Sequence, residues 1–373
     1  MHSQQPQLFD PKKPPKTFAK NANHTPTLDP LTQKQLMPTV SQVHKLIDPN
    51  APRPTKKPFL AEFLLPSYWG IWLAFAIAFS LIYLPLRWQF KLGQALGKLI
   101  FHLAKRRQQD TLINLKLCFP EKSDEERWDM AQQVFINTGV GVFESLCAWF
   151  RPDVFTRQVT ISGVQHVITA QQAGKAVLVL GAHYTMLDLG GRLASMFIPV
   201  DVVYRPQNNR LLEWFIYNAR IRIFNEQIAH QDMRHLAKSI KAGHIVWYTP
   251  DQDFGLKQGV MAPFFGVPAA TLTAQRRLAT FNKKQGGDKA NPTAVVVVHF
   301  YRETPIDMPS GKKPHYHIRF SPMLDNYPSE DEFADAVRVN RMLENFIRID
   351  ATQYMWFHRR FKTQPDGRGK YYR

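Results

Sequence analysis

The sequence predicts an α/β fold, with a mixed, mainly parallel sheet flanked by helices and a hydrophobic membrane helix on its N-terminal side. Two observations support this prediction. From residue 158 onward, short apolar runs alternate with longer amphipathic stretches, as in strands joined by helical crossovers. Before them, residues 63–86 contain no charged side chain. The length of 373 residues leaves room for one large domain or two small ones.

We expect residues 1–58 to form a disordered, Pro-rich basic arm. They hold 11 of the 27 prolines and show no hydrophobic periodicity. Lys/Pro-rich segments such as 11–15 and 51–58 are typical of disorder or of local polyproline II helix. No apolar run follows the first residues, so we expect no signal peptide.

We expect residues 59–86 to form a membrane helix. At ~1.5 Å per residue, the uncharged run 63–86 is about 36 Å long, against roughly 30 Å of hydrocarbon. Aromatic side chains near both ends resemble interfacial belts: Tyr68, Trp69, Trp72, Tyr83 and Trp88. Basic residues flank both ends almost equally, so the sequence does not decide between a helix that spans the membrane and a helix that lies within one leaflet. Residues 87–105 are typical of an amphipathic helix at the bilayer surface.

Residues 87–373 are expected to form the α/β domain. Ser123 and the acidic residues 124–126 predict the start of a helix that runs to about residue 149. The expected strands are 158–162, 176–182, 200–204, 244–249, 293–300 and 315–320. The expected helices are 184–196, 207–220, 232–242, 271–281 and 329–349. Residues 282–292 are expected to form a polar surface loop.

The segment 177–188, VLVLGAHYTMLD, places a histidine at the end of a predicted buried strand. Open α/β sheets place their chemistry at this edge. A neutral imidazole can take a proton near pH 7, and a nearby carboxylate can fix its tautomer. His183 is therefore a candidate general base, with Asp188 to orient it. Helical residues five apart lie about 140° apart, so His183 must precede the helix. A chance pairing is the alternative, since the chain holds 13 histidines.

Three further segments carry candidate functional residues. Arg220 can hold a phosphate or carboxylate by two parallel hydrogen bonds, although surface arginines are often simply solvated. Asp251 and Asp253 lie in a Pro/Gly-bounded turn and could bind a metal, although turn acids are usually caps. Residues 353–362, QYMWFHRRFK, interleave aromatic and basic side chains, a pattern that fits nucleic acid or anionic lipid headgroups.

The net charge of +18 indicates an anionic partner, which could be nucleic acid, anionic lipid or an acidic protein. Cys118 and Cys147 form no CxxC motif, which fits a reduced compartment and gives no metal signature.

In order along the chain, seven motifs resemble those of the late lipid A biosynthesis acyltransferases. They are NLKLCFPEKSDEERW (114–128), FESL (143–146), GAHYTMLDLGG (181–191), YRPQNN (204–209), WYTPDQDFG (247–255), PFFGVPAATLT (263–273) and YMWFHRRFK (354–362). The resemblance covers about residues 60–367. It implies a glycerolipid acyltransferase-like domain over residues 87–373. Two departures are visible: Asp188 stands where many members have glutamate, and Thr352 stands where proline is usual nearby.

The resemblance also implies the reaction and its residues. An acyl chain on acyl carrier protein would be transferred to a hydroxyl on an acyl chain of the Kdo-bearing lipid A precursor. His183 and Asp188 would be the catalytic pair, and Arg220 and Asp251 would bind substrate. The enzyme would act at an anionic membrane, on the cytoplasmic face of the bacterial inner membrane. A thioester is reactive enough that no metal or other cofactor is expected, only a base and oxyanion donors.

Two alternatives remain at this level. A glycerophospholipid acyltransferase shares the HxxxxD chemistry, but an FPEG-like motif would be expected after the histidine. Here FPE at 119–121 precedes it, and DQDFG occupies the later position. A membrane-tethered nucleic-acid-binding protein is favoured only by the net charge and by HRRFK, and we expect no nucleic-acid partner. Acyl length, the acylated position and the oligomeric state stay open.

Overall fold

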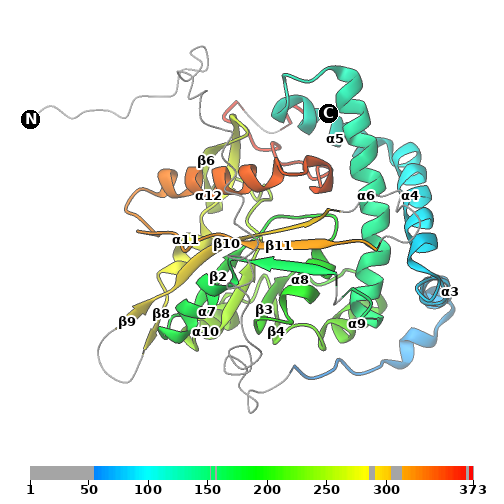
Figure 1. The fold of residues 1–373 in the computed structure, drawn as a ribbon, viewed down its shortest axis with the longest axis horizontal. Helices are drawn as coiled ribbons and strands as arrows, with labels where there is room; N and C mark the ends of the chain where they lie inside the picture. The colour runs from blue at the N-terminus through cyan, green and yellow to red at the C-terminus, as the bar shows by residue number, and fades with distance from the viewer. Residues whose placement is uncertain are drawn as a thin grey trace, which may run out of the picture. The chain divides into compact units, whose positions relative to one another are not determined.

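The computed structural model describes residues 54–151, 153–155, 158–284, 290–303, 313–366 and 369–372, which all lie within one compact unit. Its main sheet has seven strands in the order β1-β11-β10-β2-β5-β3-β4. β10 and β11 are antiparallel, and all other neighbours in this sheet are parallel. The predicted mixed, mainly parallel sheet flanked by helices is therefore confirmed (Figure 1).

The six predicted strands are all present, and β4 is an additional one. The strands of the main sheet are β1 (Val159–Ser162), β2 (Val177–Leu180), β3 (Val200–Tyr204), β4 (Glu226–Ala229), β5 (Ile245–Tyr248), β10 (Ala294–Arg302) and β11 (Tyr316–Phe320). A hairpin of β6 (Gly259–Phe264) and β7 (Val267–Leu272) was not predicted. β8 (Asn282–Lys284) and β9 (Ala290–Pro292) pair within the segment that was expected to be a loop.

The predicted helices are all present with small shifts at their ends. The helices of the domain are α4 (Leu86–Leu103), α5 (Lys105–Cys118), α6 (Asp124–Phe150), α7 (Val164–Gln172), α8 (Leu187–Ala194), α9 (Arg210–Arg220), α10 (Met233–Lys241), α11 (Ala274–Ala279) and α12 (Glu332–Ile347), of which α5 and α7 were not predicted. The predicted start of α6 is confirmed, since Ser123 and Glu126 form a capping box. α11 is shorter than predicted because residues up to Leu272 belong to β7.

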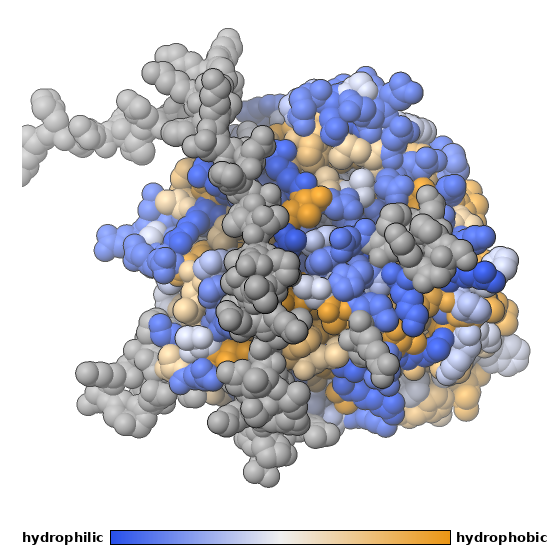
Figure 2. Space-filling view, in the orientation of Figure 1, coloured by the Kyte–Doolittle hydropathy of each residue, from blue (hydrophilic) through white to orange (hydrophobic). Residues whose placement is uncertain are grey.

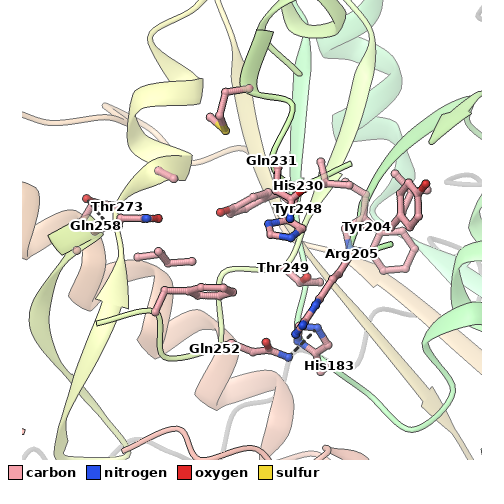
Figure 3. A pocket seen from close by; sticks show the side chains of 18 of the residues that line it. His183, Tyr204, Arg205, His230, Gln231, Tyr248, Thr249, Gln252, Gln258 and Thr273 are labelled. Carbon is pink, nitrogen blue, oxygen red and sulfur yellow. Dashed lines mark hydrogen bonds between the residues drawn. The ribbon is translucent and has the colours of Figure 1, made fainter. Parts of the chain in front are cut away.

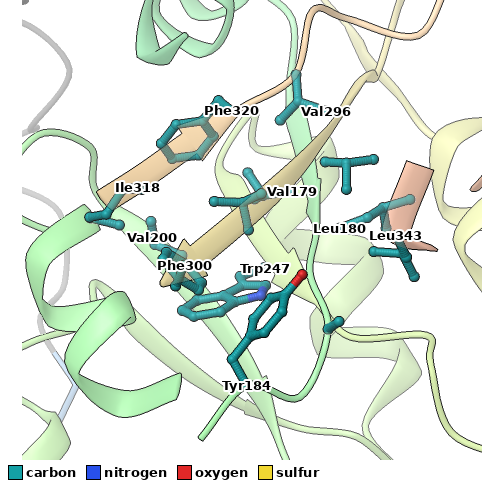
Figure 4. Close-up of a cluster of buried hydrophobic side chains, with 14 of the residues drawn as sticks. Val179, Leu180, Tyr184, Val200, Trp247, Val296, Phe300, Ile318, Phe320 and Leu343 are labelled. Carbon is teal, nitrogen blue, oxygen red and sulfur yellow. The ribbon is translucent and has the colours of Figure 1, made fainter. Parts of the chain in front are cut away.

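Strand β10 shows how the helices cover the sheet. Its successive side chains point to opposite faces. Phe300 faces α8, where a Cβ on Gly190 would lie 2.5 Å from its ring. Arg302 faces α6 and pairs with Glu144 at 2.6 Å. His299 points the other way and stacks on Phe346 of α12 at 5.1 Å. Helices therefore cover both faces, and the strands between them are buried (Figures 1 and 4).

The expected single membrane helix over 59–86 is not what the structure has. This stretch forms a 3-10 helix η1 (Ala61–Leu64), then α3 (Pro66–Leu81), then a turn into α4. Pro85 disfavours helical conformation at the residue before it. The Gln89 side chain donates to the carbonyls of Ile82 and Leu84, at 2.7 Å each, and closes the turn. Across the described residues, no helix combines the length and apolarity that a bilayer crossing requires.

Helix α3 packs on α9 along one side and is exposed on the other. Phe75 stacks on Phe215 of α9 with ring centroids 3.6 Å apart. Trp69, Leu73 and Ile77 are more than half exposed. Figure 2 shows hydrophobic side chains at the edge of the molecule where Figure 1 places α3. Uncovered apolar surface of this kind is typical of interaction sites.

Residues 1–53 of the expected arm lie outside the described residues, whereas its last residues run along α9. The backbone N–H of Lys57 donates to Asn218 Oδ1 at 2.9 Å. The Lys57 carbonyl accepts from the indole N–H of Trp214 at 3.0 Å. The chain is therefore fixed to α9 just before η1.

Helices α4 and α6 lie unusually close together, which fixes the position of α6 beside the sheet. A Cβ on Gly93 or Gly97 would lie within 3 Å of the α6 backbone, and one on Gly139 would lie 2.1 Å from the Gly93 carbonyl oxygen. Only glycine permits this approach of two backbones.

Candidate active site

The candidate catalytic residues leave two neighbouring strands at the same edge of the sheet. β2 and β5 are parallel, and their last residues, Leu180 and Tyr248, are paired in register. His183 and Asp251 each follow three residues later, so the topology alone brings their loops together. Gly181 begins the first loop, where a Cβ would lie 2.6 Å from the indole nitrogen of Trp247.

His183 is held by Asp251 through two hydrogen bonds. The imidazole Nδ1 lies 2.6 Å from Asp251 Oδ1, and the His183 backbone N–H donates to Oδ2 at 2.9 Å. The hydroxyl of Tyr354 also donates to Oδ2, at 3.0 Å. Asp251 is buried, while a fifth of the His183 side chain is exposed. This arrangement fixes both the ring orientation and the tautomer of the base.

The two members of this pair shift each other's pKa. Burial lowers the pKa of His183, but the charge of Asp251 and its hydrogen bond outweigh this, so the pKa lies above 6.5. Burial raises the pKa of Asp251, but the charge and hydrogen bonds of His183 lower it to about 2. Asp251 is therefore an ionised acceptor at neutral pH, and the Nδ1 of His183 carries a proton toward it.

Asp188 does not contact His183, contrary to the expected arrangement. α8 begins at Leu187, so His183 precedes the helix as the spacing required, and Asp188 lies in its first turn. There, Asp188 Oδ1 accepts from Arg220 Nε at 2.9 Å and Nη2 at 2.6 Å. The acid lies at a helix N-terminus and the arginine in the last turn of α9, which both helix dipoles favour.

Gln252 is a site residue that the sequence motifs did not single out. Its side-chain nitrogen lies 3.2 Å from Nε2 of His183, on the ring edge opposite Asp251. The neighbouring Asp253 points into the protein, where it accepts from the backbone of Gly255 at 2.8 Å and from the backbone of Thr363 at 2.6 Å. The place of Gln252 in the WYTPDQDFG motif was the only signal in the sequence, because long-range hydrogen bonds set the inward direction of the two neighbouring acids.

The C-terminal segment closes the site from behind. The backbone N–H of Met355 donates to the His183 carbonyl at 2.9 Å, and Thr185 donates to the Gln353 carbonyl at 2.8 Å. The His358 ring lies 5.4 Å from the His183 ring. Burial, followed by the charge of His183, lowers the pKa of His358 to about 4, so it stays neutral. These contacts give the residues 353–358 a supporting role that the sequence did not predict.

The basic run HRRFK does not form the free basic rim that was considered from the sequence. Arg359 pairs with Asp110 of α5 at 3.0 Å. Arg360 is buried and donates to the Ala270 carbonyl of β7 at 2.6 Å. These two charges are used in packing the C-terminal segment onto the domain.

A cleft of about 1490 Å³ opens over His183. Figure 3 shows Tyr204 and Arg205 at one end, Gln258 and Thr273 at the other, and Tyr248 and His230 between them. The first end adjoins α9, which carries Arg220, and the second adjoins the β6/β7 hairpin and α11. Apolar side chains line the interior: Leu187, Val202, Phe224, Trp247 and Leu272. The cleft can hold a long, mostly apolar substrate across the base.

The described residues offer one cluster with metal-ligating groups close together, Glu303, His315 and His317, and it does not line the cleft. Asp251 and Asp253, considered above as metal ligands, are each hydrogen-bonded to protein groups. Cys118 and Cys147 are buried free thiols, whose pKa burial raises.

The motif resemblance is matched by comparison with known proteins. The bacterial lipid A biosynthesis acyltransferase family matches residues 56–363. The chain is 34% identical to the lipid A biosynthesis lauroyltransferase of Escherichia coli (strain K12), over 83% of this chain and 96% of that protein. It is 33% identical to the palmitoleoyltransferase of that strain, over 84% and 98%, and 26% identical to its myristoyltransferase, over 83% and 92%. The chain is therefore an acyltransferase that belongs to the bacterial lipid A biosynthesis acyltransferase family.

Proposed function

We propose that this enzyme transfers a fatty acyl chain from acyl carrier protein to a hydroxyl of an acyl chain on the Kdo-bearing lipid A precursor. The observation that carries the proposal is the buried Asp251–His183 pair, whose Nε2 edge faces a large, apolar-lined cleft. Family membership supports the lipid acceptor, and the chemistry of the pair supports proton transfer from a hydroxyl.

In the proposed reaction, Nε2 of His183 takes the hydroxyl proton as the oxygen attacks the thioester carbonyl. A tetrahedral oxyanion forms and then collapses, which breaks the carbon–sulfur bond. The departing thiolate takes the proton back from Nε2, so an ester and a thiol are the products. Asp251 keeps the Nδ1 proton in place and stabilises the imidazolium between these steps. In this proposal Asp251, and not Asp188, is the residue that orients the base.

Asp188 and Arg220 are proposed to act together in substrate binding. A guanidinium has five N–H donors, and Asp188 accepts from only two groups of Arg220. Arg220 lines the α9 end of the cleft, where its remaining donors would meet an anionic group of the lipid precursor. Asp188 would hold the guanidinium in one orientation.

The two ends of the cleft suggest how both substrates approach. The exposed side of α3 lies on the α9 side, and we propose that it rests on the anionic cytoplasmic face of the bacterial inner membrane and delivers the lipid acceptor. At the other end, exposed Phe254 and Leu256 lie beside Lys257 and Arg277. This apolar surface with basic neighbours would receive the acidic acyl carrier protein.

The test is mass spectrometry of lipid A from cells with and without the gene, and from cells that carry His183→Ala. We expect the deletion and the variant to lack one fatty acyl chain that the wild type has, and the mass difference gives its length. Identical lipid A in all three strains, at equal protein levels, would reject the proposed function.

A further inference from the structure

The turn that follows β5 holds the backbone of one cleft-lining residue between two anchored acids. Asp251 is tied to His183 and Tyr354 on one side, and Asp253 to Gly255 and Thr363. Both carboxylates point into the protein, so the residue between them faces the cleft that it lines. Gln252 is therefore held at its backbone from both sides, while its side chain remains free to turn about its own torsions.

When the His183 ring is neutral, its contact with Gln252 has only one possible hydrogen-bond direction. Because Nδ1 carries a proton toward ionised Asp251, the neutral ring has a lone pair at Nε2. An amide nitrogen donates and does not accept, so the 3.2 Å contact is an N–H···N hydrogen bond from Gln252 to Nε2 (Figure 3). The lone pair that must take the substrate proton is thus already occupied when the cleft is empty.

Acceptor binding must therefore displace Gln252. The hydroxyl has to donate to the same lone pair, so the amide turns away while its backbone stays fixed. Its N–H groups are then free of His183 beside the hydroxyl oxygen, and rotation of the side chain can turn one of them toward the carbonyl that this oxygen attacks. The reaction needs a neutral, preorganised donor at this place, because the carbonyl oxygen gains a full negative charge.

We propose that Gln252 is a catalytic residue with two successive partners: Nε2 of His183 in the free site, and the carbonyl oxygen of the thioester once the acceptor hydroxyl has bound. The inference rests on the proposed function. Gln252 exchanges no proton, so the balance of the acyl transfer is unchanged. Its N–H shortens its hydrogen bond as the oxyanion forms and releases it when the carbon–sulfur bond breaks.

The test compares Gln252→Met, which keeps the length but has no donor, with Gln252→Glu, which places a negative charge beside the oxyanion. Gln133→Met on α6, which does not line the cleft, is the matched control. With acyl carrier protein donor, we expect kcat to fall on the order of 10²-fold in Gln252→Met and further in Gln252→Glu. KM and the melting temperature should stay near the wild-type values.

A second measurement separates this role from a structural one and needs no substrate. Gln252 stabilises neutral imidazole, so its loss should raise the pKa of His183 in an NMR titration of the free protein, and the control should not. An active wild type with unchanged kcat in Gln252→Met, or an unmoved His183 titration, would overturn the inference. A wild type that transfers no acyl chain would instead reject the proposed function.

Discussion

At the scale of single residues, the site contains two acid–base pairs that the sequence could not tell apart. His183–Asp251 is a hydrogen-bonded dyad with its free nitrogen toward the cleft, and Asp188–Arg220 is an ion pair at its side. Of the two acids, only Asp251 contacts the histidine and raises its pKa. The pH dependence of the enzyme is therefore the most direct way to assign their roles.

Asp251→Asn should move the pH profile and lower the rate. The base must be neutral, and its pKa lies above 6.5, so wild-type kcat/KM should rise as the pH increases through that raised value. Removing the carboxylate charge lowers the pKa of His183, so the rising acid limb of the kcat/KM profile should shift to lower pH. The kcat should fall about 10²–10⁴-fold, because the tautomer is no longer fixed. An unmoved limb in steady-state profiles from pH 5 to 9 would contradict the dyad.

Asp188→Asn provides the matched comparison, because it makes the same chemical change in the other pair. We expect reduced transfer with the acid limb of kcat/KM in its wild-type position, since Arg220 and not His183 loses its partner. If Asp188→Asn shifted the limb as Asp251→Asn does, the assignment of the orienting acid would have to be reversed.

Arg220→Ala should weaken binding of the lipid acceptor more than it slows the chemical step. We expect a larger rise in the acceptor KM than fall in kcat, with the donor KM little changed. Initial rates at varied concentrations of each substrate measure this. A loss confined to kcat would speak against a role in ground-state binding.

At the scale of elements, the strands were predictable because β-branched and leucine runs are buried on both faces of a mostly parallel sheet. β4 (Glu226–Ala229, EQIA) was missed because it is short and half polar. The β6/β7 hairpin was missed because its sequence, with two prolines, gives no alternation. The break between α3 and α4 was missed because the uncharged run continues through it, whereas α3 ends at Leu81 and Pro85 and the Gln89 side chain shape the turn that follows.

The exposed side of α3 leads to a prediction about membrane binding. Leu73→Lys with Ile77→Lys should reduce flotation with anionic liposomes, because each large apolar side chain that leaves the bilayer costs about 1.5–3 kcal/mol. Transfer to membrane-embedded acceptor should fall in parallel. Gln172→Lys with Ala242→Lys adds the same charge at exposed positions elsewhere and should float like the wild type. Equal flotation of both double variants would exclude α3 as the docking element.

At the scale of the whole molecule, the cleft connects two chemically different ends, and the site lies between them. The sequence predicted both partners from family resemblance but not their sides, because His183 and Asp251 are 68 positions apart in the chain and meet only through the β2–β5 register. Spacing along the chain pointed to Asp188 as the partner of His183. In the folded chain, the pairing of β2 with β5 brings Asp251 to His183 instead.

The donor end can be tested by charge reversal. Lys257→Glu with Arg277→Glu should raise the KM for acyl carrier protein donor roughly tenfold and weaken its salt dependence. The same variant should use a small acyl thioester as well as the wild type does, since the base is untouched. Arg341→Glu on α12 is exposed outside the cleft and is the control. An equal loss with both donors would place the defect in the active site.

The attachment of residues 353–363 behind the base also bears on how the enzyme is made. Tyr354 bonds Asp251, Met355 bonds the His183 carbonyl, and Thr363 bonds Asp253. On the ribosome, η1 and α3 emerge long before these residues do. If α3 is the docking element proposed above, the nascent chain reaches the membrane first, while the loops that carry its base and acids still lack their support. Synthesis order thus separates arrival at the surface from the onset of acyl transfer.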